Sequence, residues 1–419
     1  MTDNHWGGIL QGRNSKQVAE EFRKTLAAKM AGVESAEALN LLRRVREELL
    51  KEISAGRRIP EEVEALIENL PAIHFADELQ SSRDHFLQLA AELYRTRSSV
   101  SSTFSLAQSF YDSLITTAFN HAVTQLRNEG RSSSGLIYAL LVSGELGRGE
   151  SILGSRSSFF FIYRETAEAD HVYSKELAMR FMAVLSICLP DISRNLNSPS
   201  AYWFGSDTQW NKTTVDLLRA DDSDNWDKAG GNSFTLFIET VADMRIVCGD
   251  PDFGRGIIAT GRKLLADYLK SDNFWHLAKD TATMPVALGV FSRFKTVRSG
   301  SNRGKIDLKK MAIDPLANAA RILSLADGKE ETTFSGRIKS ILAAGNLGVA
   351  LADGLLIAYQ DFMRERIRLE LTANNGNDGL FFDPEELDEE SKERFRAGLD
   401  DTTTLQRLIH QQLVEVESG

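Results

Sequence analysis

The residues of this chain that are best suited to chemistry lie in one glycine-rich segment, Leu141–Glu150. An apolar run enters this segment, and a second apolar run, Phe159–Tyr163, follows it. A glycine-rich turn between two buried strands can offer backbone N–H groups to a phosphate. Metal-assisted chemistry on that phosphate would also need carboxylates nearby to hold metal ions. Arg156-Ser157-Ser158 leads into the second strand instead, so the frame is present and the carboxylates are missing.

The turn itself has two interpretations, which the sequence leaves equally open. Gly144, Gly147 and Gly149 could cradle a phosphate, or they could only form a tight turn from a strand to a helix. Arg148 and Glu150 carry opposite charges two residues apart, and we expect a structural ion pair that holds the turn.

Composition and charge limit the class of protein. The chain has 419 residues, with 42% hydrophobic and 26% charged residues, which is typical of a globular protein of two or three domains. Its net charge of −10 argues against nucleic acid or anionic membrane as a partner, because both need a basic face. Two cysteines cannot form a cysteine-type zinc site, and the histidines have no metal-binding spacing. We find no signal peptide and no apolar run near the ~20 residues of a membrane span, so we expect a cytoplasmic protein.

Hydrophobic periodicity predicts a small sheet within a helical chain. Apolar residues recur at helical spacing over residues 16–72, 75–128 and 252–419, and proline is scarce. Short continuous apolar runs predict buried strands at Leu136–Val142 and at Phe159–Tyr163. Phe234–Ile238 with Val241–Val247 predicts a third strand and leaves a fourth open. Polar, glycine-rich stretches predict loops at Asp221–Gly231 and Asn374–Gly379.

Several motifs together resemble one family. Its members read roughly Gly-Ser-x-Gly-Arg-x-Glu, then five residues, then Asp-x-Asp and an apolar strand. This chain has Gly144–Glu150, five residues, Arg156–Ser158 and then Phe159–Tyr163, without a gap. It thus resembles the bacterial nucleotidyltransferases related to PII-uridylyltransferase, within the polymerase-beta-like superfamily.

The resemblance continues downstream, over roughly residues 75–415. The matching segments are Gln209-Trp210, Ala242–Arg245 with Gly249-Asp250, Ile306–Lys309, Pro315, Ala320–Leu323, and the series Arg364, Arg366 and Arg368. It implies an α+β, mostly helical fold, in which a small mixed sheet of the nucleotidyltransferase type lies between an N-terminal helical region and a C-terminal helical bundle. The expected divisions are residues 1–72, a nucleotidyltransferase-like domain at 73–258, and a substrate-binding domain at 259–419.

The resemblance also defines the expected site and its departures. The nucleotide or phosphate turn would comprise Gly144, Glu145, Gly147, Arg148 and Glu150, and the substrate domain would contribute Lys309, Arg321 and Arg366. Arg156 and Ser158 occupy the two expected aspartate positions, which changes the local charge from −2 to +1. Glu145 replaces the serine that would bond a phosphate.

Asp243 remains as the third carboxylate of the family pattern, on a strand beside Gly144–Gly149. We favour a relic ion pair between Asp243 and Arg245 over a live metal ligand. Because residues two apart share one face of a strand, we expect Arg156 and Ser158 to project together beside the turn.

These departures favour a pseudoenzyme, a nucleotidyltransferase-like scaffold that binds a partner and regulates without catalysis. No metal and no cofactor are expected, and the partner would be a protein, with a homo-oligomer as a further option. The alternative is an active nucleotidyltransferase that uses Mg²⁺ and a nucleoside triphosphate, with Glu145, Glu150 and Asp243 in a rearranged site. A nucleotide sensor without turnover is a third option. We expect residues 16–72 to bury their leucine faces on this chain or on another protomer.

Overall fold

The computed structural model describes residues 59–97, 99–132, 135–152, 157–189, 202–219, 238, 240–268, 273–372 and 380–415. The predictions for helices before residue 59 and for loops at 221–231 and 374–379 lie outside the described residues, and so does Arg156.

The strands between residues 138 and 249 form a four-stranded mixed sheet. Its strands are β1 (Tyr138–Gly144), β2 (Ser157–Tyr163), β3 (Tyr202–Ser206) and β4 (Arg245–Gly249), in the order β3-β2-β1-β4. β1 is antiparallel to β2 and β4, whereas β2 is parallel to β3. The predicted first and second strands are confirmed, and so is the mixed character of the sheet.

The rest of the sheet differs from the prediction. β3 was not predicted, and β4 begins only at Arg245. Residues 240–242 are helical, so the prediction of a strand from Val241 is wrong in its first half. A short apolar run does not distinguish a buried strand from a buried helical turn, and Val241 is buried in either conformation. Of the run Phe234–Ile238, only Ile238 is described, and it is helical.

The two faces of the sheet pack against different helices, because successive side chains of a strand point to opposite sides. Phe159 and Phe161 face the core that contains α4 (Val100–Asn128) and α6 (Glu168–Cys188). Phe160 faces a second core, where Trp210 packs against it with ring centroids 5.4 Å apart. The helices on that side are α8 (Asp207–Arg219) and α10 (Pro251–Tyr268). Alternate residues of β2 therefore contribute to two different hydrophobic cores, one on each face of the sheet.

Helices make up most of the remaining chain, as predicted. Before the sheet, residues 59–69 are helical and are followed by η1 (Leu70–Ala72), α3 (Ala76–Arg97) and α4. After α10 the elements are α11 (Asn273–Ala282), η2 (Val290–Ser292), β5 (Ile306–Asp307), η3 (Lys309–Ile313), α12 (Asp314–Ala326), α13 (Phe334–Ala343), α14 (Val349–Thr372), β6 (Phe381–Phe382), η4 (Pro384–Glu386), α15 (Glu389–Ile409) and η5 (His410–Val414).

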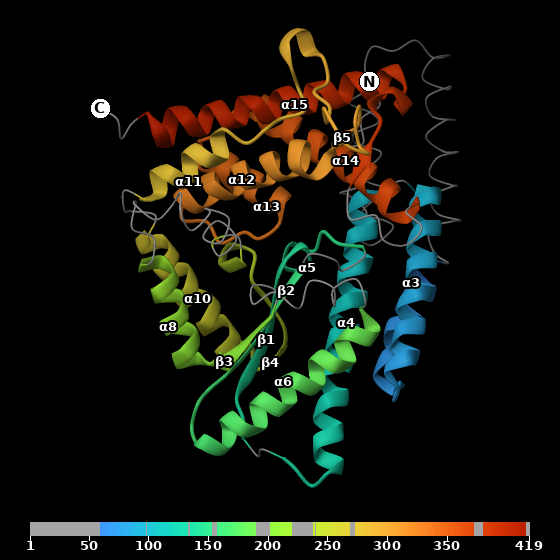
Figure 1. The fold of residues 1–419 in the computed structure, drawn as a ribbon, viewed down its shortest axis with the longest axis vertical. Helices are drawn as coiled ribbons and strands as arrows, with labels where there is room; N and C mark the ends of the chain where they lie inside the picture. The colour runs from blue at the N-terminus through green and yellow to red at the C-terminus, as the bar shows by residue number, and fades with distance from the viewer. Residues whose placement is uncertain are drawn as a thin grey trace, which may run out of the picture.

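Side-chain caps mark where two of these helices begin. The hydroxyl of Thr333 accepts from the Gly336 amide at the start of α13, and the carboxylate of Asp388 accepts from the Ser391 amide at the start of α15. In Figure 1 these helices lie above the sheet, and the turn after β1 points up towards them. This arrangement brings the glycine-rich turn against the C-terminal helices. None of the described helices is long and apolar enough to cross a membrane.

Candidate functional site

The glycine-rich segment forms a tight turn around the short helix α5 (Glu145–Arg148). Gly144 and Gly149, on either side of it, have φ angles of 72° and 65°, which favour glycine. A Cβ atom on Gly147 would lie 2.2 Å from the backbone oxygen of Asp243, so this position has no room for a side chain. These constraints explain all three glycines as parts of a turn. Phosphate binding by the turn stays a prediction.

One backbone donor of the turn is already bonded within the chain. The Leu146 amide donates to the hydroxyl of Ser157, at 3.0 Å. Ser157 lies at the first position of β2, opposite Gly144 in the register. A phosphate that used this amide would have to displace the serine hydroxyl.

Arg148 joins the turn to two carboxylates. Its Nε lies 2.7 Å from Glu150, which confirms the predicted ion pair, and its terminal nitrogen lies 2.5 Å from Asp243. Both carboxylate side chains are buried. Burial alone would lower the pKa of Arg148, but Asp243 and Glu150 outweigh it and raise that pKa above its usual value. Arg148 therefore holds two carboxylates of the candidate site at one guanidinium group.

Asp243 is the centre of the cluster and is completely buried. Besides Arg148, it contacts Arg321 of α12 at 2.9 Å and Arg337 of α13 at 2.7 Å. Burial would raise the pKa of this carboxyl group, but the guanidinium groups of Arg321, Arg337 and Arg148 together hold it below its usual value. Asp243 is thus an ionised carboxylate with three cationic partners, two of them from the C-terminal helices.

Two expectations about this segment were wrong. Asp243 lies in the turn before β4, although it does lie beside the Gly144–Gly149 turn as predicted. Arg245 does not pair with it: both terminal nitrogens of Arg245 bond Asp112 of α4, at 2.9 and 2.7 Å, and its Nε donates to the Leu146 carbonyl. The two side chains are two residues apart, and each finds a different partner.

A second ion-pair group lies at the start of α5. The side chain of Arg366, on α14, contacts Glu145 at 2.5 Å and Glu370 at 2.7 Å, and all three are buried. Burial would lower the pKa of Arg366, but the two carboxylates raise it. The Phe334 amide, at the start of α13, donates to Glu150 at 3.1 Å. Both ends of the turn are therefore tied to the C-terminal helices.

The ion-pair group around Asp243 carries a net charge of +1 and the group around Arg366 a net charge of −1, so the charges balance in the two groups together, which we call the seam cluster. It consists of four guanidinium groups and four carboxylates, those of Arg148, Arg321, Arg337, Arg366, Glu145, Glu150, Asp243 and Glu370. Such balance is required because an unpaired charge in a dry interior is costly.

The remaining predicted residues lie apart from the cluster. Ser158 is half-buried and pairs with Ser143 across the two strands. Its side chain lies on the opposite face of β2 from that of Ser157. Lys309 pairs with Asp314, 2.6 Å away within the same helical segment, and takes no part in the seam cluster. Of the three residues expected from the substrate domain, the structure brings Arg321 and Arg366 to the turn.

The sequence contained a signal for Arg337 that was missed. Phe334, Ile338 and Ile341 form the buried face of α13, and Arg337 lies on that same face. A single arginine among apolar residues at helical spacing indicates a buried ion pair, because the charge must be compensated. Nothing local identifies the partner, which is 94 residues away.

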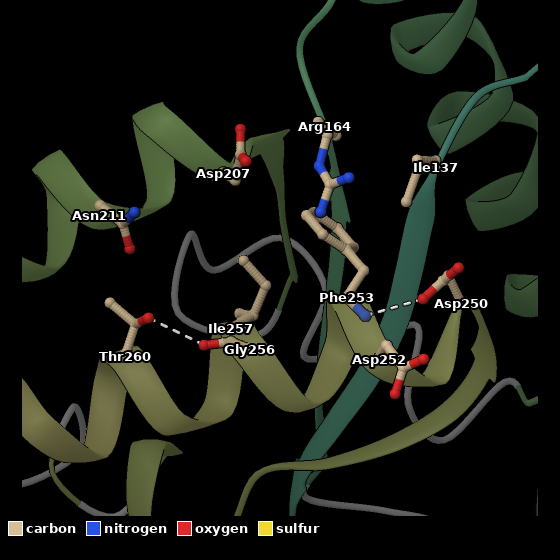
Figure 2. Close-up of a pocket in the computed structure, with 10 residues that line it drawn as sticks. All are labelled: Ile137, Arg164, Asp207, Asn211, Asp250, Asp252, Phe253, Gly256, Ile257 and Thr260. Carbon is tan, nitrogen blue, oxygen red and sulfur yellow. Dashed lines mark hydrogen bonds between the residues drawn. The ribbon is translucent and has the colours of Figure 1, made fainter.

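A separate pocket of about 420 Å³ opens at the other end of the sheet. It lies where β1 begins and where the N-terminal ends of α8 and α10 meet. Figure 2 shows Asp207, Asp250 and Asp252 around it, with the Arg164 guanidinium over the ring of Phe253, 5.0 Å from the ring centroid. The sequence interpretation did not identify this pocket.

The donor groups of the seam cluster do not fit the metal clamp of nucleotidyl transfer. That clamp needs carboxylates free to bind Mg²⁺, whereas Asp243 and Glu145 lie against guanidinium groups. Ser158, at an expected aspartate position, offers only a neutral hydroxyl. Among the residues that the structure describes, no group of three or more His, Cys, Asp or Glu side chains could hold a metal ion.

Comparison with known protein families matches most of the described chain. The family described as "Putative nucleotidyltransferase DUF294" matches residues 84–224, which include β1, the turn, β2 and β3. The family described as "Putative nucleotidyltransferase substrate binding domain" matches residues 271–413, which include α12, α13 and α14. A search of curated proteins found no match. The two matches together cover more than half of the chain, so it belongs to the family of nucleotidyltransferase-like proteins that these models describe and has their C-terminal substrate-binding domain.

Proposed function

We propose that this protein is a nucleotidyltransferase-like scaffold that does not transfer nucleotides and instead binds a protein partner in a regulatory role. One observation carries the proposal: Asp243, the remaining carboxylate of the expected site, has three arginine partners in a fully buried position. In an active enzyme of this type the carboxylates face metal ions and substrate.

The magnitudes favour the ion-paired state over metal binding. Two like unit charges ~4 Å apart cost ~4 kcal/mol at an effective dielectric constant near 20, and a divalent cation roughly doubles this cost. A Mg²⁺ ion at Asp243 would meet this repulsion from Arg148, Arg321 and Arg337. The two aspartates that would offset it in the family pattern are replaced by Arg156 and Ser158.

A second candidate function is Mg²⁺-dependent transfer of a nucleoside monophosphate to a protein or small acceptor, as the resemblance to PII-uridylyltransferases implies. Glu150 and Asp243 favour it, because they share the guanidinium group of Arg148 and so lie close together beside the turn. For these carboxylates to bind a metal, the arginines would have to move away.

The other parts of the proposal follow from charge and composition. A chain with a net charge of −10 is suited to a protein partner, or to other copies of itself, rather than to nucleic acid or an anionic membrane. We propose a cytoplasmic protein that works without a resident cofactor.

The test is transfer of label from radioactive ATP or UTP, with Mg²⁺, to the protein itself or to proteins of a cell extract. We expect no incorporation above that of a heat-denatured sample, and calorimetry should show no Mg²⁺-dependent heat of ATP binding. Incorporation that Glu150→Gln abolishes and that the control Asp252→Asn retains would overturn the proposal in favour of the second candidate. Both variants should first be shown to be folded by circular dichroism.

A further inference from the structure

Two features of the molecule lie outside the seam cluster. One is hollow and acidic, and the other projects and is basic. The first is the pocket between β1, α8 and α10. The second is the segment between α11 and β5, which projects beyond α15 at the top of Figure 1, whereas α8 and α10 lie in the lower half. They are therefore well separated on one chain.

The projecting segment consists of a tight turn and a longer loop. The loop, which carries Arg298 and Arg303, is closed where the Val297 amide donates to the Lys305 carbonyl at 2.8 Å. In the tight turn, the Gly289 amide donates to the Arg293 carbonyl at 2.7 Å, and Val290 and Phe291 at its tip are 77% and 91% exposed. Phe291 and Ser292 have φ angles of 57° and 55°, a strained conformation for residues with side chains. The strain holds an apolar pair outside the body of the protein. Large side chains exposed in this way are typical of contact sites.

The same segment is strongly basic in an acidic chain. Its cations are Arg293, Lys295, Arg298, Arg303 and Lys305, and it contains no acidic residue between positions 283 and 305. None of the five forms an ion pair with a described residue. We call this segment, residues 287–305, the basic hairpins. Their charge and projecting shape are complementary to an acidic pocket.

The pocket offers such a surface. Asp207, Asp250 and Asp252 line it, and Arg164 is the one cation among its lining residues. Asp252 also pairs with Arg255 at the exposed edge of the pocket, so an incoming cation would exchange with or join that surface pair. Its apolar wall includes Phe253 and Ile257, both largely buried.

An independent observation at the pocket points to a hydrogen-bond donor as its ligand. The side-chain oxygen of Asn211, which lines the pocket, is buried and has no hydrogen-bond partner among the described residues. A buried acceptor without a partner is costly. An arginine or lysine side chain in the pocket would satisfy it once the Asn211 amide turns its oxygen towards the pocket.

We infer that the basic hairpins of one copy of this chain dock into the acidic pocket of a second copy. The apolar tip would contact the pocket wall, while the cations would face the three aspartates. Because the hairpins and the pocket are different surfaces, a single contact is heterologous. It closes only if two copies exchange hairpins reciprocally or if several form a ring. This inference extends the proposed partner binding, but it involves neither the turn nor the seam cluster, so either can fail alone.

The test is sedimentation velocity of the full chain over a range of concentrations at low ionic strength. We expect concentration-dependent self-association that weakens with salt. Arg298→Glu/Arg303→Glu should raise the dissociation constant about tenfold or more, and so should Asp207→Lys/Asp252→Lys. The control Lys329→Glu/Lys339→Glu changes the net charge by the same amount at exposed positions elsewhere, and it should leave association unchanged.

Mixing the two charge-reversed variants separates docking from misfolding. In the mixture, the reversed hairpins of one variant meet the reversed pocket of the other, and the unchanged hairpins of the second meet the unchanged pocket of the first. The mixture should therefore associate more tightly than either variant alone. A chain that stays monomeric at all concentrations would overturn the inference. So would a control that weakens association as much as the hairpin variant does, or a mixture that fails to recover. Incorporation of nucleotide would not affect the inference, whereas it would overturn the proposed function.

Discussion

Replacement of Asp243 by asparagine should destabilise the protein through one buried charge. Asparagine has nearly the same shape, so this variant removes the charge and leaves Arg148, Arg321 and Arg337 around a neutral side chain. Removal of one partner from a buried ion pair costs roughly 3–5 kcal/mol. At an unfolding entropy of about 2.1 cal/mol/K per residue, a cooperative unit of 419 residues shifts by about 1 °C per kcal/mol, so the melting temperature should fall by roughly 3–6 °C.

Two further variants test whether the loss of stability comes from the buried charge of Asp243. Asp252→Asn removes an aspartate whose side chain is 89% exposed, and it should cost less than about 1 kcal/mol. Asp243→Asn/Arg337→Met restores the balance of charges in the seam cluster, and it should be more stable than Asp243→Asn alone. Chemical unfolding at neutral pH measures all three. If Asp243→Asn unfolds within about 1 kcal/mol of the wild type, the ion-pair account of the cluster is wrong.

The loss of stability caused by Asp243→Asn should decrease as the pH falls. The pKa of Asp243 is lower in the folded protein than its ordinary value of 3.8, because the three guanidinium groups outweigh the effect of burial. Its contribution to stability is therefore fully present above about pH 5 and is lost as the pH falls through the folded-state pKa. The difference in unfolding free energy between the wild type and Asp243→Asn should shrink over that acid range. A difference that grows towards low pH would contradict the assignment.

Three other variants or probes test separate contacts. Gly147→Ala should cost roughly 1–3 kcal/mol on urea unfolding, because its Cβ would lie 2.2 Å from a backbone oxygen, whereas Gly256→Ala, which faces open space, should not show this clash. Arg366→Met should cost roughly 3–5 kcal/mol because it removes the cation that two buried carboxylates share. The control Arg255→Met, whose side chain is 66% exposed and whose partner Asp252 is 89% exposed, should cost less than about 1 kcal/mol. Burial raises the pKa of the Cys248 thiol to about 12, so iodoacetamide at pH 8 should label it far more slowly in the folded than in the unfolded chain; equal rates would contradict this.

Local patterns were sufficient to predict the core of the sheet and its turn. Leu136–Val142 and Phe159–Tyr163 are short continuous apolar runs, and such runs suit strands that are buried on both faces. β3 was missed because its five residues, Tyr202–Ser206, give too short a pattern to distinguish from a loop. It joins the sheet by parallel pairing with β2, a contact that no local signal specifies.

The sequence predicted which residues of the turn and of Ala242–Arg245 lie together in the candidate site. It did not predict most of the ion pairs that they form. Gly144–Glu150 and Asp243 do meet, as the family pattern implies. The partners of Glu145 and Asp243 come from α12, α13 and α14, up to 221 residues away along the chain. Sequence periodicity shows that a charged residue lies on an apolar helix face, but it does not show which opposite charge meets it there. The expected pair of Asp243 with Arg245 failed for this reason.

The candidate site differs from the family pattern in two independent ways. The first is the absence of aspartates at positions 156 and 158, which Arg156→Asp/Ser158→Asp would reverse. The second is the occupation of Asp243 by arginines of the C-terminal helices, which that double variant leaves in place. If the missing aspartates alone set this site apart from the family pattern, the variant would gain Mg²⁺-dependent ATP binding in calorimetry. The repulsion at Asp243 gives a reason to expect no such gain, because the third carboxylate of the clamp would remain bound within the protein.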